Sequence, residues 1–373
     1  MGATHLKVLR VPDRNSGIFP KPHRPTYLSP LVSDSSEIMS LVRDLYKQKK
    51  FGPAENFLKK LLAEDPFNTE AIALLLGIYS RTGHMSKAQM LFQESRIFAD
   101  REVYTAYIDF CCHNKKSYEA YNYEGVEILQ EAKSKGAATP EAFAMLITYF
   151  GYLGKGFIAE SIFEGSAGQR DASIYSAFIF SCCRCREPWK GERALDRAQN
   201  ENILDPQMFK NLVKHYSDCK MIWDARRIFD WAIARDQVDT ELCSLMVQGY
   251  LYGEHNVQGA REIFDIAMQR GIATSDLCSL METGYMDSKM HEAAEEIFHI
   301  AENSGMAGQE LALAVMRGYT CAGKKQQALD FYSANRELLA LNREARWYHS
   351  LAEKQAEKEA PSSVNDNPAA STS

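Results

Sequence analysis

The sequence has no long apolar run, no excess of basic residues and no secretory-type opening segment. No stretch approaches the roughly twenty apolar residues needed to span a bilayer, which argues against membrane insertion. The formal net charge of −6 argues against the overall basic surface typical of proteins that bind phosphate backbones. Nine cysteines without a secretory segment predict free thiols in a reducing, intracellular compartment. We favour the cytoplasm, with the mitochondrion as the alternative.

The sequence also lacks the short motifs of the common catalytic sites. It contains no glycine-rich phosphate loop, no H-E-x-x-H zinc motif and no nucleophile elbow. Its carboxylate pairs, such as Glu292 with Glu295, stand at ordinary surface spacings. We therefore predict a non-catalytic protein with no catalytic residues, no cofactor, no metal and no small-molecule substrate.

Cys182 and Cys185 form the strongest candidate metal motif, a C-x-x-C pair with His215 and Cys219 in the following repeat. Such a set suits zinc in principle. The pair falls within an expected helix rather than a tight knuckle, which favours buried thiols over a metal site. Other cysteines also stand at expected helix-packing positions: Cys111, Cys112, Cys243, Cys278 and Cys321.

The sequence does contain a tandem repeat. After Thr240, the strings Leu-Cys-Ser-Leu-Met, Gly-Tyr and Ile-Phe recur some 35 residues later, before Gly305. A small residue followed four positions later by an apolar one marks each repeat, and successive marks are 32 to 37 residues apart. The marks are Ala54/Leu58, Ala88/Phe92, Gly125/Leu129, Ala159/Phe163, Gly191/Leu195, Ala225/Phe229, Ala260/Phe264, Ala294/Phe298 and Ala328/Tyr332.

This spacing predicts helical hairpins. A small residue allows two helices to cross closely, and the apolar residue one turn later fills the space between them. An aromatic residue of the first helix precedes several marks by eight to ten positions, as Tyr79 precedes Ala88. Because such repeats bury a core only by stacking, we expect an all-α, right-handed α-solenoid (superhelix) of about nine helix-turn-helix repeats of 34–35 residues.

The flanking segments differ in composition from the repeats. Residues 1–34 hold five prolines and five basic residues, which predicts an extended, proline-rich arm. We expect the repeat domain at 35–356, ending in a capping helix from Asn342 to Gln355 with Trp347 and Leu351 facing inward. The polar residues 357–373 should form a disordered tail. Trp189 and Trp223, each two positions before a mark, are predicted to pack in the core.

The repeat spacing resembles that of the pentatricopeptide and tetratricopeptide repeat families over roughly residues 36–340. Pro66, twelve residues after Ala54, is similar to a tetratricopeptide boundary, and the Gly-Tyr pairs beginning at 249, 284 and 318 are similar to pentatricopeptide repeats. The pentatricopeptide resemblance implies binding of single-stranded RNA, one base per repeat, through a polar residue of each first helix and another at the repeat boundary.

Two registers of that first-helix position remain open. The first register gives mostly apolar residues: Leu74, Ala106, Met145, Ala177, Asn211, Leu245, Leu280 and Ala314. The second, shifted by one residue, gives polar ones: Thr105, Ser176, Ser244 and Ser279. The first also leaves Glu282 on a face that should be packed, which counts against that register.

The sequence thus favours a protein–protein interaction scaffold or assembly subunit that uses a concave groove. The alternative is a single-stranded RNA-binding pentatricopeptide protein in organellar or other RNA processing. The acidic balance and the apolar first register favour a protein partner. The resemblance and the second register favour RNA, with basic residues of the first helix after Pro206 meeting phosphates. The candidate groove residues are Lys210, Asn211, Lys214, Ser244 and Ser279.

Overall fold

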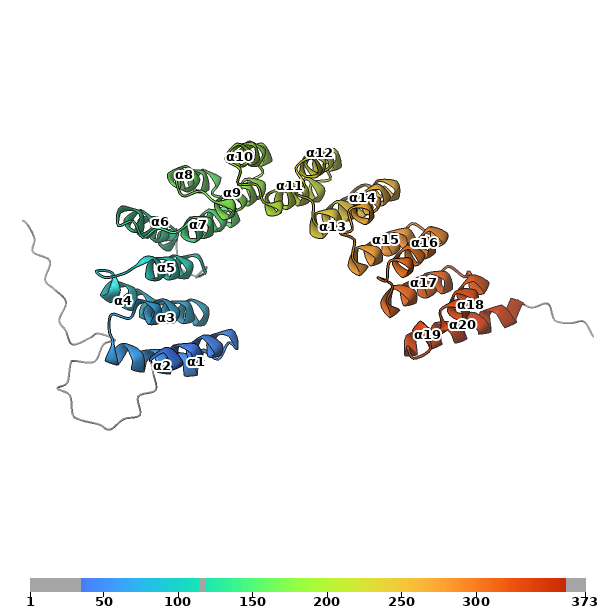
Figure 1. The fold of residues 1–373 in the computed structure, drawn as a ribbon, viewed down its shortest axis with the longest axis horizontal. Helices are drawn as coiled ribbons and strands as arrows, with labels where there is room; N and C mark the ends of the chain where they lie inside the picture. Colours follow the sequence, from blue (N-terminus) through green and yellow to red (C-terminus); the bar gives the residue numbers. More distant parts are fainter. Residues whose placement is uncertain (1–34, 114–118, 360–373) are drawn as a thin grey trace, which may run out of the picture. The chain divides into compact units, whose positions relative to one another are not determined.

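Helices joined by short turns make up residues 35–113 and 119–359, which the computed structural model describes (Figure 1). Within these residues the chain contains no strand, and nine helix pairs follow one another in the order that the marks predict. The all-α repeat fold is confirmed. The expected arm at 1–34, most of the expected tail and part of the insertion in the third repeat lie outside the described residues.

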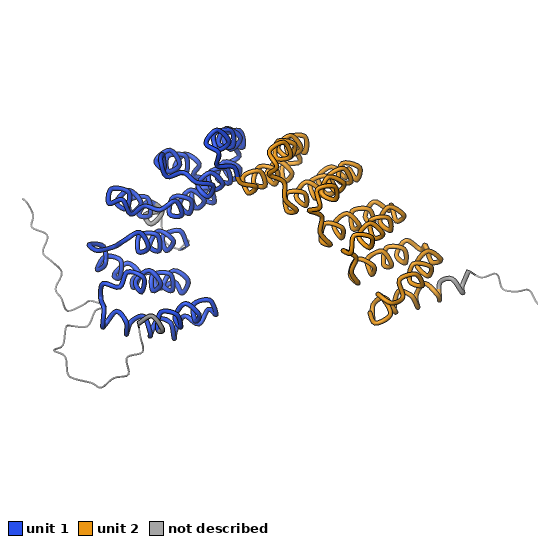
Figure 2. Tube along the Cα trace, viewed as in Figure 1, with its two compact units in different colours: residues 1–204 blue, residues 205–373 orange. Residues whose placement is uncertain are grey.

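The chain divides into two compact units, residues 1–204 and residues 205–373 (Figure 2). The first helices of unit 1 are α1 (Ser35–Lys47), α3 (Thr69–Thr82), α5 (Arg101–His113), α7 (Pro140–Tyr152) and α9 (Ala172–Arg184). The second helices are α2 (Phe51–Glu64), α4 (Met85–Ser95), α6 (Glu119–Ser134), α8 (Gly156–Gly165) and α10 (Pro188–Asn200). In unit 1 each first helix packs against its own second helix, and α3, α5, α7 and α9 pack one against the next.

Unit 2 repeats the same arrangement. Its first helices are α11 (Pro206–Asp218), α13 (Thr240–Gln248), α15 (Ser275–Asp287) and α17 (Gln309–Cys321). Its second helices are α12 (Ile222–Ala234), α14 (Val257–Gln269), α16 (His291–Asn303) and α18 (Lys325–Ala334). A short helix, α19 (Arg336–Leu339), precedes α20 (Arg343–Glu359), which packs on α17 and α18 and extends past the expected start of the tail at 357.

The marked residues form the core, as predicted, except that Tyr332 of the last mark is half-buried. Ala88 and Phe92 are fully buried, and the Phe92 ring stacks on Tyr107 of α5 with centroids 3.9 Å apart. Tyr79, the aromatic residue of the first helix that precedes the mark Ala88, is also fully buried, and its hydroxyl donates a hydrogen bond to Glu55 of α2 at 3.4 Å. A glutamate of the preceding repeat thus satisfies the one polar atom of this tyrosine.

The two ends of each hairpin use different chemistry. Several first helices begin with a short polar side chain that accepts from a backbone N–H, as Thr139 and Asp239 do. The turns to second helices need a left-handed residue, which glycine adopts cheaply at Gly83. Gly253 does not end a helix in this way: it lies inside a π-helical segment, η1 (Gly249–Glu254), and His255 takes the left-handed conformation instead.

Three predictions of buried tryptophans are wrong. Trp189 is 55% exposed, Trp223 is 82% exposed, and Trp347 of α20 is 58% exposed. A residue two positions before a helix-packing residue is rotated by about 200° from it and so points away from the core. In α20 the buried positions are Ala345 and Ala352, seven residues apart, and Trp347 lies off that face.

All nine cysteines are free thiols, and most are buried. Burial raises the pKa of Cys243 to about 12 and that of Cys278 to about 11. Cys321, predicted to pack between helices, is exposed near the end of α17. Among the helices of the described ranges, none combines the length and the apolar character that crossing a bilayer requires.

Candidate binding groove

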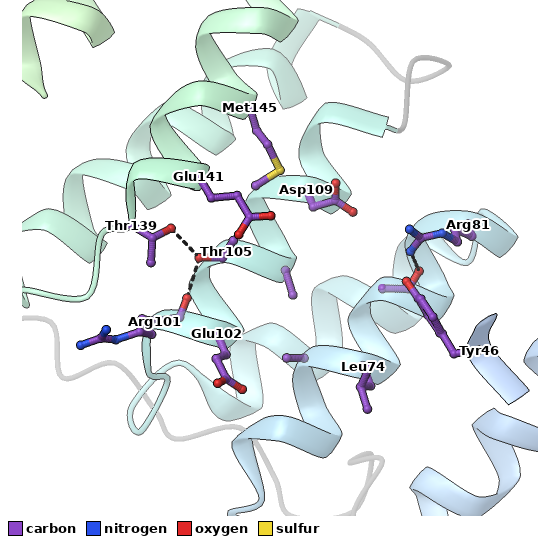
Figure 3. A pocket seen from close by; sticks show the side chains of 13 residues that line it. Tyr46, Leu74, Arg81, Arg101, Glu102, Thr105, Asp109, Thr139, Glu141 and Met145 are labelled. Carbon is purple, nitrogen blue, oxygen red and sulfur yellow. Dashed lines mark hydrogen bonds between the residues drawn. The ribbon is translucent and has the colours of Figure 1, made fainter. Parts of the chain in front are cut away.

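The first helices of unit 1 line a pocket of 460 Å³ (Figure 3). Its wall comes from α1, α3, α5 and α7, together with the residue that caps α7. No second helix contributes to it. The side of the first helices that faces away from the second helices is therefore the hollow face of this unit, as expected for a repeat array.

Both sequence registers lie on this hollow face. Leu74, Ala106 and Met145 of the first register line the pocket, and so does Thr105 of the second. Adjacent helix positions are 100° apart, so a wide groove takes in both. The choice between registers is therefore not a choice between groove and core.

Polar groups in the unit 1 pocket hydrogen-bond to one another. The Thr105 hydroxyl donates to the carbonyl oxygen of Arg101 at 2.7 Å and lies 3.0 Å from the hydroxyl of Thr139 (Figure 3). Thr139 in turn accepts from the backbone N–H of Ala142 at 3.1 Å. A first-helix residue and the boundary residue of the next repeat are thus occupied with each other.

The far end of this pocket is closed by a cation–π contact. The guanidinium of Arg81 lies 4.8 Å from the ring centroid of Tyr46. Gly77 makes room for that ring, because a Cβ at this position would stand 2.9 Å from the Tyr46 hydroxyl. The α1–α3 end of the groove is thus occupied by side chains of the chain itself.

In unit 2 the predicted serines lie on the corresponding face of their helices and are half-buried. The Ser244 hydroxyl donates to the Thr240 carbonyl at 2.9 Å, one turn earlier. Asn211 is also half-buried, and its side-chain oxygen accepts from Gln207 at 3.1 Å. Lys214, on the same helix as Asn211, is exposed. Ser279 completes the predicted set on α15.

Lys210 is not a solvent-facing cation. Its side chain is almost buried, and its ammonium lies 2.5 Å from Glu241 and 3.1 Å from Asp239. Burial acts to lower the pKa of Lys210, but the hydrogen bonds from the two carboxylates outweigh it and raise the pKa above the ordinary value. The charge of Lys210 is therefore neutralised by carboxylates of the next repeat. Arg226 is likewise paired, with Asp230 and Glu262.

The groove carries a row of acids that sequence reasoning missed. In five first helices the residue 18 or 19 positions before the mark, three before the second-register position, is acidic. In the longer third repeat Glu102 holds the same place, three positions before Thr105 and 23 before the mark. Glu70 pairs with Arg43, and Glu241 pairs with Lys210. Four members are exposed, and no ion pair is seen for them within the described ranges. These four, which we call the acidic row, are Glu102, Glu141, Asp276 and Glu310.

Two members of the acidic row lie on the groove side of the unit 1 helices, and the other two hold the equivalent helix positions in unit 2. Glu102 and Glu141 line the unit 1 pocket beside Thr105 and Thr139 (Figure 3). A carboxylate in the first turn also stabilises the helix N-terminus through the helix dipole. The signal was present in the sequence as an acid early in the first helix of six of the nine repeats. It becomes interpretable once the groove side of the helices is known.

Unit 2 has its own pocket, of 740 Å³, between α15, α17 and the start of α16. Glu282 lines it and is fully buried. The first register placed Glu282 on a packed face, and the structure agrees. The presence of Glu282 on that face therefore no longer counts against the first register.

No protein-family model and no curated protein matches this chain. Among solved structures it is similar to the crystal structure of the pentatricopeptide repeat protein PPR10 from maize, at 14% identity and a TM-score of 0.45, over 87% of this chain and 55% of that one. PPR10 was also solved in complex with an 18-nt psaJ RNA element.

A second similar structure is a tetratricopeptide repeat protein from Parabacteroides merdae, at 11% identity and a TM-score of 0.35, over 85% of this chain and 98% of that one. A third is the APC/C hetero-tetramer Cut9–Hcn1, at 13% identity and a TM-score of 0.31, over 87% and 57%. The chain spans a little over half the length of the first and third of these proteins.

Proposed function

We propose that this chain is a non-catalytic scaffold or assembly subunit that binds a protein partner along its first helices, and that the bound segment of the partner is basic. The acidic row is the observation that carries the proposal. It puts exposed carboxylates on the groove side of α5 and α7 in unit 1 and at the equivalent positions of α15 and α17 in unit 2.

Exposed carboxylates along a groove favour one sign of ligand. Each contact with a lysine or arginine contributes only about 0.2–1 kcal/mol at an exposed site. A row of them acts together, because it steers association and disfavours wrong partners through like-charge repulsion. A nucleic-acid backbone carries one negative charge per nucleotide, so the acidic row opposes its binding in the groove.

Single-stranded RNA remains the second candidate, favoured by the half-buried hydroxyls of Ser244 and Ser279 on the groove side of their helices. Base readout of this kind needs nearby cations to hold the phosphates. Lys210 is paired with two carboxylates, which leaves the exposed Lys214 as the basic residue of α11 that remains from the predicted set.

The test compares the protein with a variant in which the acidic row is neutralised: Glu102→Gln, Glu141→Gln, Asp276→Asn and Glu310→Gln. Crosslinking capture from native lysate should recover a reproducible protein partner with the unchanged protein and lose it with the variant. In a filter-binding assay at low salt, the unchanged protein should retain no pooled single-stranded RNA on the filter.

A matched control neutralises four exposed acids outside the first helices: Glu64, Glu127, Asp196 and Glu337. This control should keep the partner, because the net charge changes equally while the groove does not. RNA retention by the unchanged protein, with no reproducible protein partner, would overturn the proposal in favour of the second candidate. Equal loss of the partner in both variants would show that net charge, and not the groove, determines binding.

A further inference from the structure

One position of the first helix is aliphatic and buried in every repeat except one. It lies twelve or thirteen residues before the mark, or seventeen in the repeat with the insertion. At eight of these positions the side chain is apolar and fully buried. These are Val42, Leu76, Ile108, Ile147, Ile179, Val213, Val247 and Met316. In α15 the residue is Glu282, which is just as buried.

Glu282 has no partner that offsets its burial. Neither carboxylate oxygen has a hydrogen-bond partner in the described part of the chain, and both are buried. Removing an unpaired carboxylate from water costs several kcal/mol unless it stays protonated. Burial raises the pKa of Glu282 to about 8, although the charge of Arg317 acts to lower it. The fold thus keeps an acid where an aliphatic residue would be more stable, which is typical of a functional position.

A pocket lies directly against this acid. Glu282 lines the 740 Å³ pocket with Ala314 and Gly318 of α17. Gly318 makes room for the side chain of Met286, because a Cβ at Gly318 would overlap the Met286 sulfur. The volume is within the usual range for a ligand site. The flexible side chains of Met286 and Arg317 also line the pocket. Because Glu282 is fully buried, side chains of the lining have to move for a ligand to reach its carboxylate.

The charged and titratable groups around the pocket come from three helices and their turns. They are Asp287, Lys289, His291, Arg317, Cys321 and Lys324. Lys324 is paired with Glu292 of α16. Burial lowers the pKa of His291, which keeps its ring neutral at neutral pH. The pocket is therefore lined by charges of both signs for which no ion pair is seen in the described residues, those of Asp287, Lys289 and Arg317. It is also lined by the carboxyl group of Glu282, which has no hydrogen-bond partner there.

The ligand chemistry follows from what a buried carboxylate needs. An ionised carboxylate is only an acceptor, and it is best satisfied by a cation with several N–H donors, such as a guanidinium or an ammonium. A nucleobase amino group is a neutral donor, so it would leave the charge of the carboxylate unpaired. A cationic side chain provides both the donors and the opposite charge.

We propose that the α15–α17 pocket binds an arginine or lysine side chain of the partner, whose charged group pairs with the carboxylate of Glu282. This inference rests on the proposed function, because it supplies the anchor residue of the same basic segment. It adds that one cation is buried, whereas the acidic row meets the others at the surface. Buried anchors of this kind carry a large share of interface affinity.

The test uses the isolated full chain and a small probe. The protein is labelled with ¹³C at the glutamate side-chain carboxyls, and the signal that titrates near pH 8 is assigned by its absence in Glu282→Gln. Saturating Nα-acetyl-arginine methylamide should lower the midpoint of that signal by about one pH unit or more, as a cation beside a carboxylate does. The norleucine analogue, which lacks the guanidinium, should leave the midpoint unchanged. Glu337→Gln, a matched control at an exposed position of α19 outside the first helices, should respond like the unchanged protein.

Three results would overturn the inference. If the arginine probe does not move the titration midpoint, Glu282 is a structural acid. If only cytidine monophosphate lowers the midpoint, the pocket binds a nucleobase, and if Nα-acetyl-glutamate methylamide raises it, the pocket binds an anion. The probe experiment needs no partner, so it can fail while the acidic row still captures a protein. It can equally succeed while the protein retains RNA, in which case only the proposed function fails.

Discussion

The pockets of the two units differ in whether their buried or half-buried polar side chains have hydrogen-bond partners. In unit 1, Thr105 and Thr139 hydrogen-bond across a repeat boundary, and Arg81 lies over Tyr46. In unit 2, Glu282 lies unpaired at the wall of a larger pocket. The same repeat architecture therefore produces one groove whose threonine hydroxyls are hydrogen-bonded to each other and one whose buried carboxylate has no hydrogen-bond partner in the described residues. The difference comes from single side chains, because the helices around them are built alike.

A repeat array can tolerate one unfavourable residue of this kind. Its stability is approximately a sum over repeats and their interfaces, so the favourable contacts along the array offset the destabilisation caused by one buried acid. Around α15 those contacts include the fully buried Met281 and Phe298. Three changes should break or sharpen the contrast between the units.

The largest effect is expected from placing an acid in unit 1 at the position of Glu282. Ile108→Glu should lower the free energy of unfolding by about 3–5 kcal/mol, because Ile108 is fully buried and an unpaired carboxylate there has to be desolvated. Urea unfolding followed by circular dichroism measures this loss. Ile108→Leu is the control and should cost less than about 1.5 kcal/mol. A loss below about 1 kcal/mol for the glutamate variant would show that any repeat accepts a buried acid.

A smaller gain is expected from making unit 2 like unit 1. Glu282→Leu should raise the free energy of unfolding by about 3 kcal/mol near pH 8, because it removes a buried group that has no partner and must give up its proton on unfolding. The folded protein holds the Glu282 proton up to about pH 8, whereas the unfolded chain releases it near 4.5. The unchanged protein should therefore lose up to about 1.4 kcal/mol of stability per pH unit between these values.

The leucine variant has no carboxyl group at this position and so does not lose stability in this way. The difference in the free energy of unfolding between the two proteins should therefore increase from pH 5 to pH 8 and stay constant above pH 8. Urea midpoints at pH 5, 6.5 and 8 give the comparison. Glu310→Gln, at an exposed position of α17, should run parallel to the unchanged protein at all three. Parallel curves for Glu282→Leu would mean that Glu282 is ionised and satisfied in the folded state.

The smallest effects concern ion pairs on the first helices. Lys210→Ala in unit 2 should cost about 1 kcal/mol, because it removes an almost buried ammonium held by two carboxylates. Arg43→Ala in unit 1 breaks a pair whose side chains are about half exposed, so it should cost under about 0.5 kcal/mol. Thermal midpoints at low and at 0.5 M salt separate the two cases. Equal losses that both disappear in salt would identify Lys210 as a surface cation.

The fold followed from the sequence because its main determinant is a local spacing. A small residue such as Ala88 is required wherever two helices cross closely, and that requirement leaves the same mark in every repeat. The direction of other side chains did not follow from spacing alone. Trp189 and Trp223 stand close to a mark in sequence, yet they lie on the opposite side of the helix and are exposed.

The candidate groove was predictable only in part. The helix positions of Ser244 and Ser279 follow from the repeat register, and both registers turned out to face the same hollow. The state of Lys210 depends on Asp239 and Glu241, some thirty residues further along the chain, and pairing at that distance needs the tertiary structure. Glu282 attracted notice as an acid on a packed face, but its pocket is lined in part by residues of α17 and was not visible in the sequence.

The π-helical turn at Gly249–Glu254 lies in a repeat one residue longer than its neighbours, with thirteen residues from Val247 to Ala260 where the repeats on either side have twelve. A π turn holds one more residue than an α turn over the same rise. The repeat can therefore gain or lose a codon at this point without rotating the helix that follows, since the extra residue bulges within a single turn. Such a turn gives the gene a place where small changes in length are tolerated inside a helix as well as in loops.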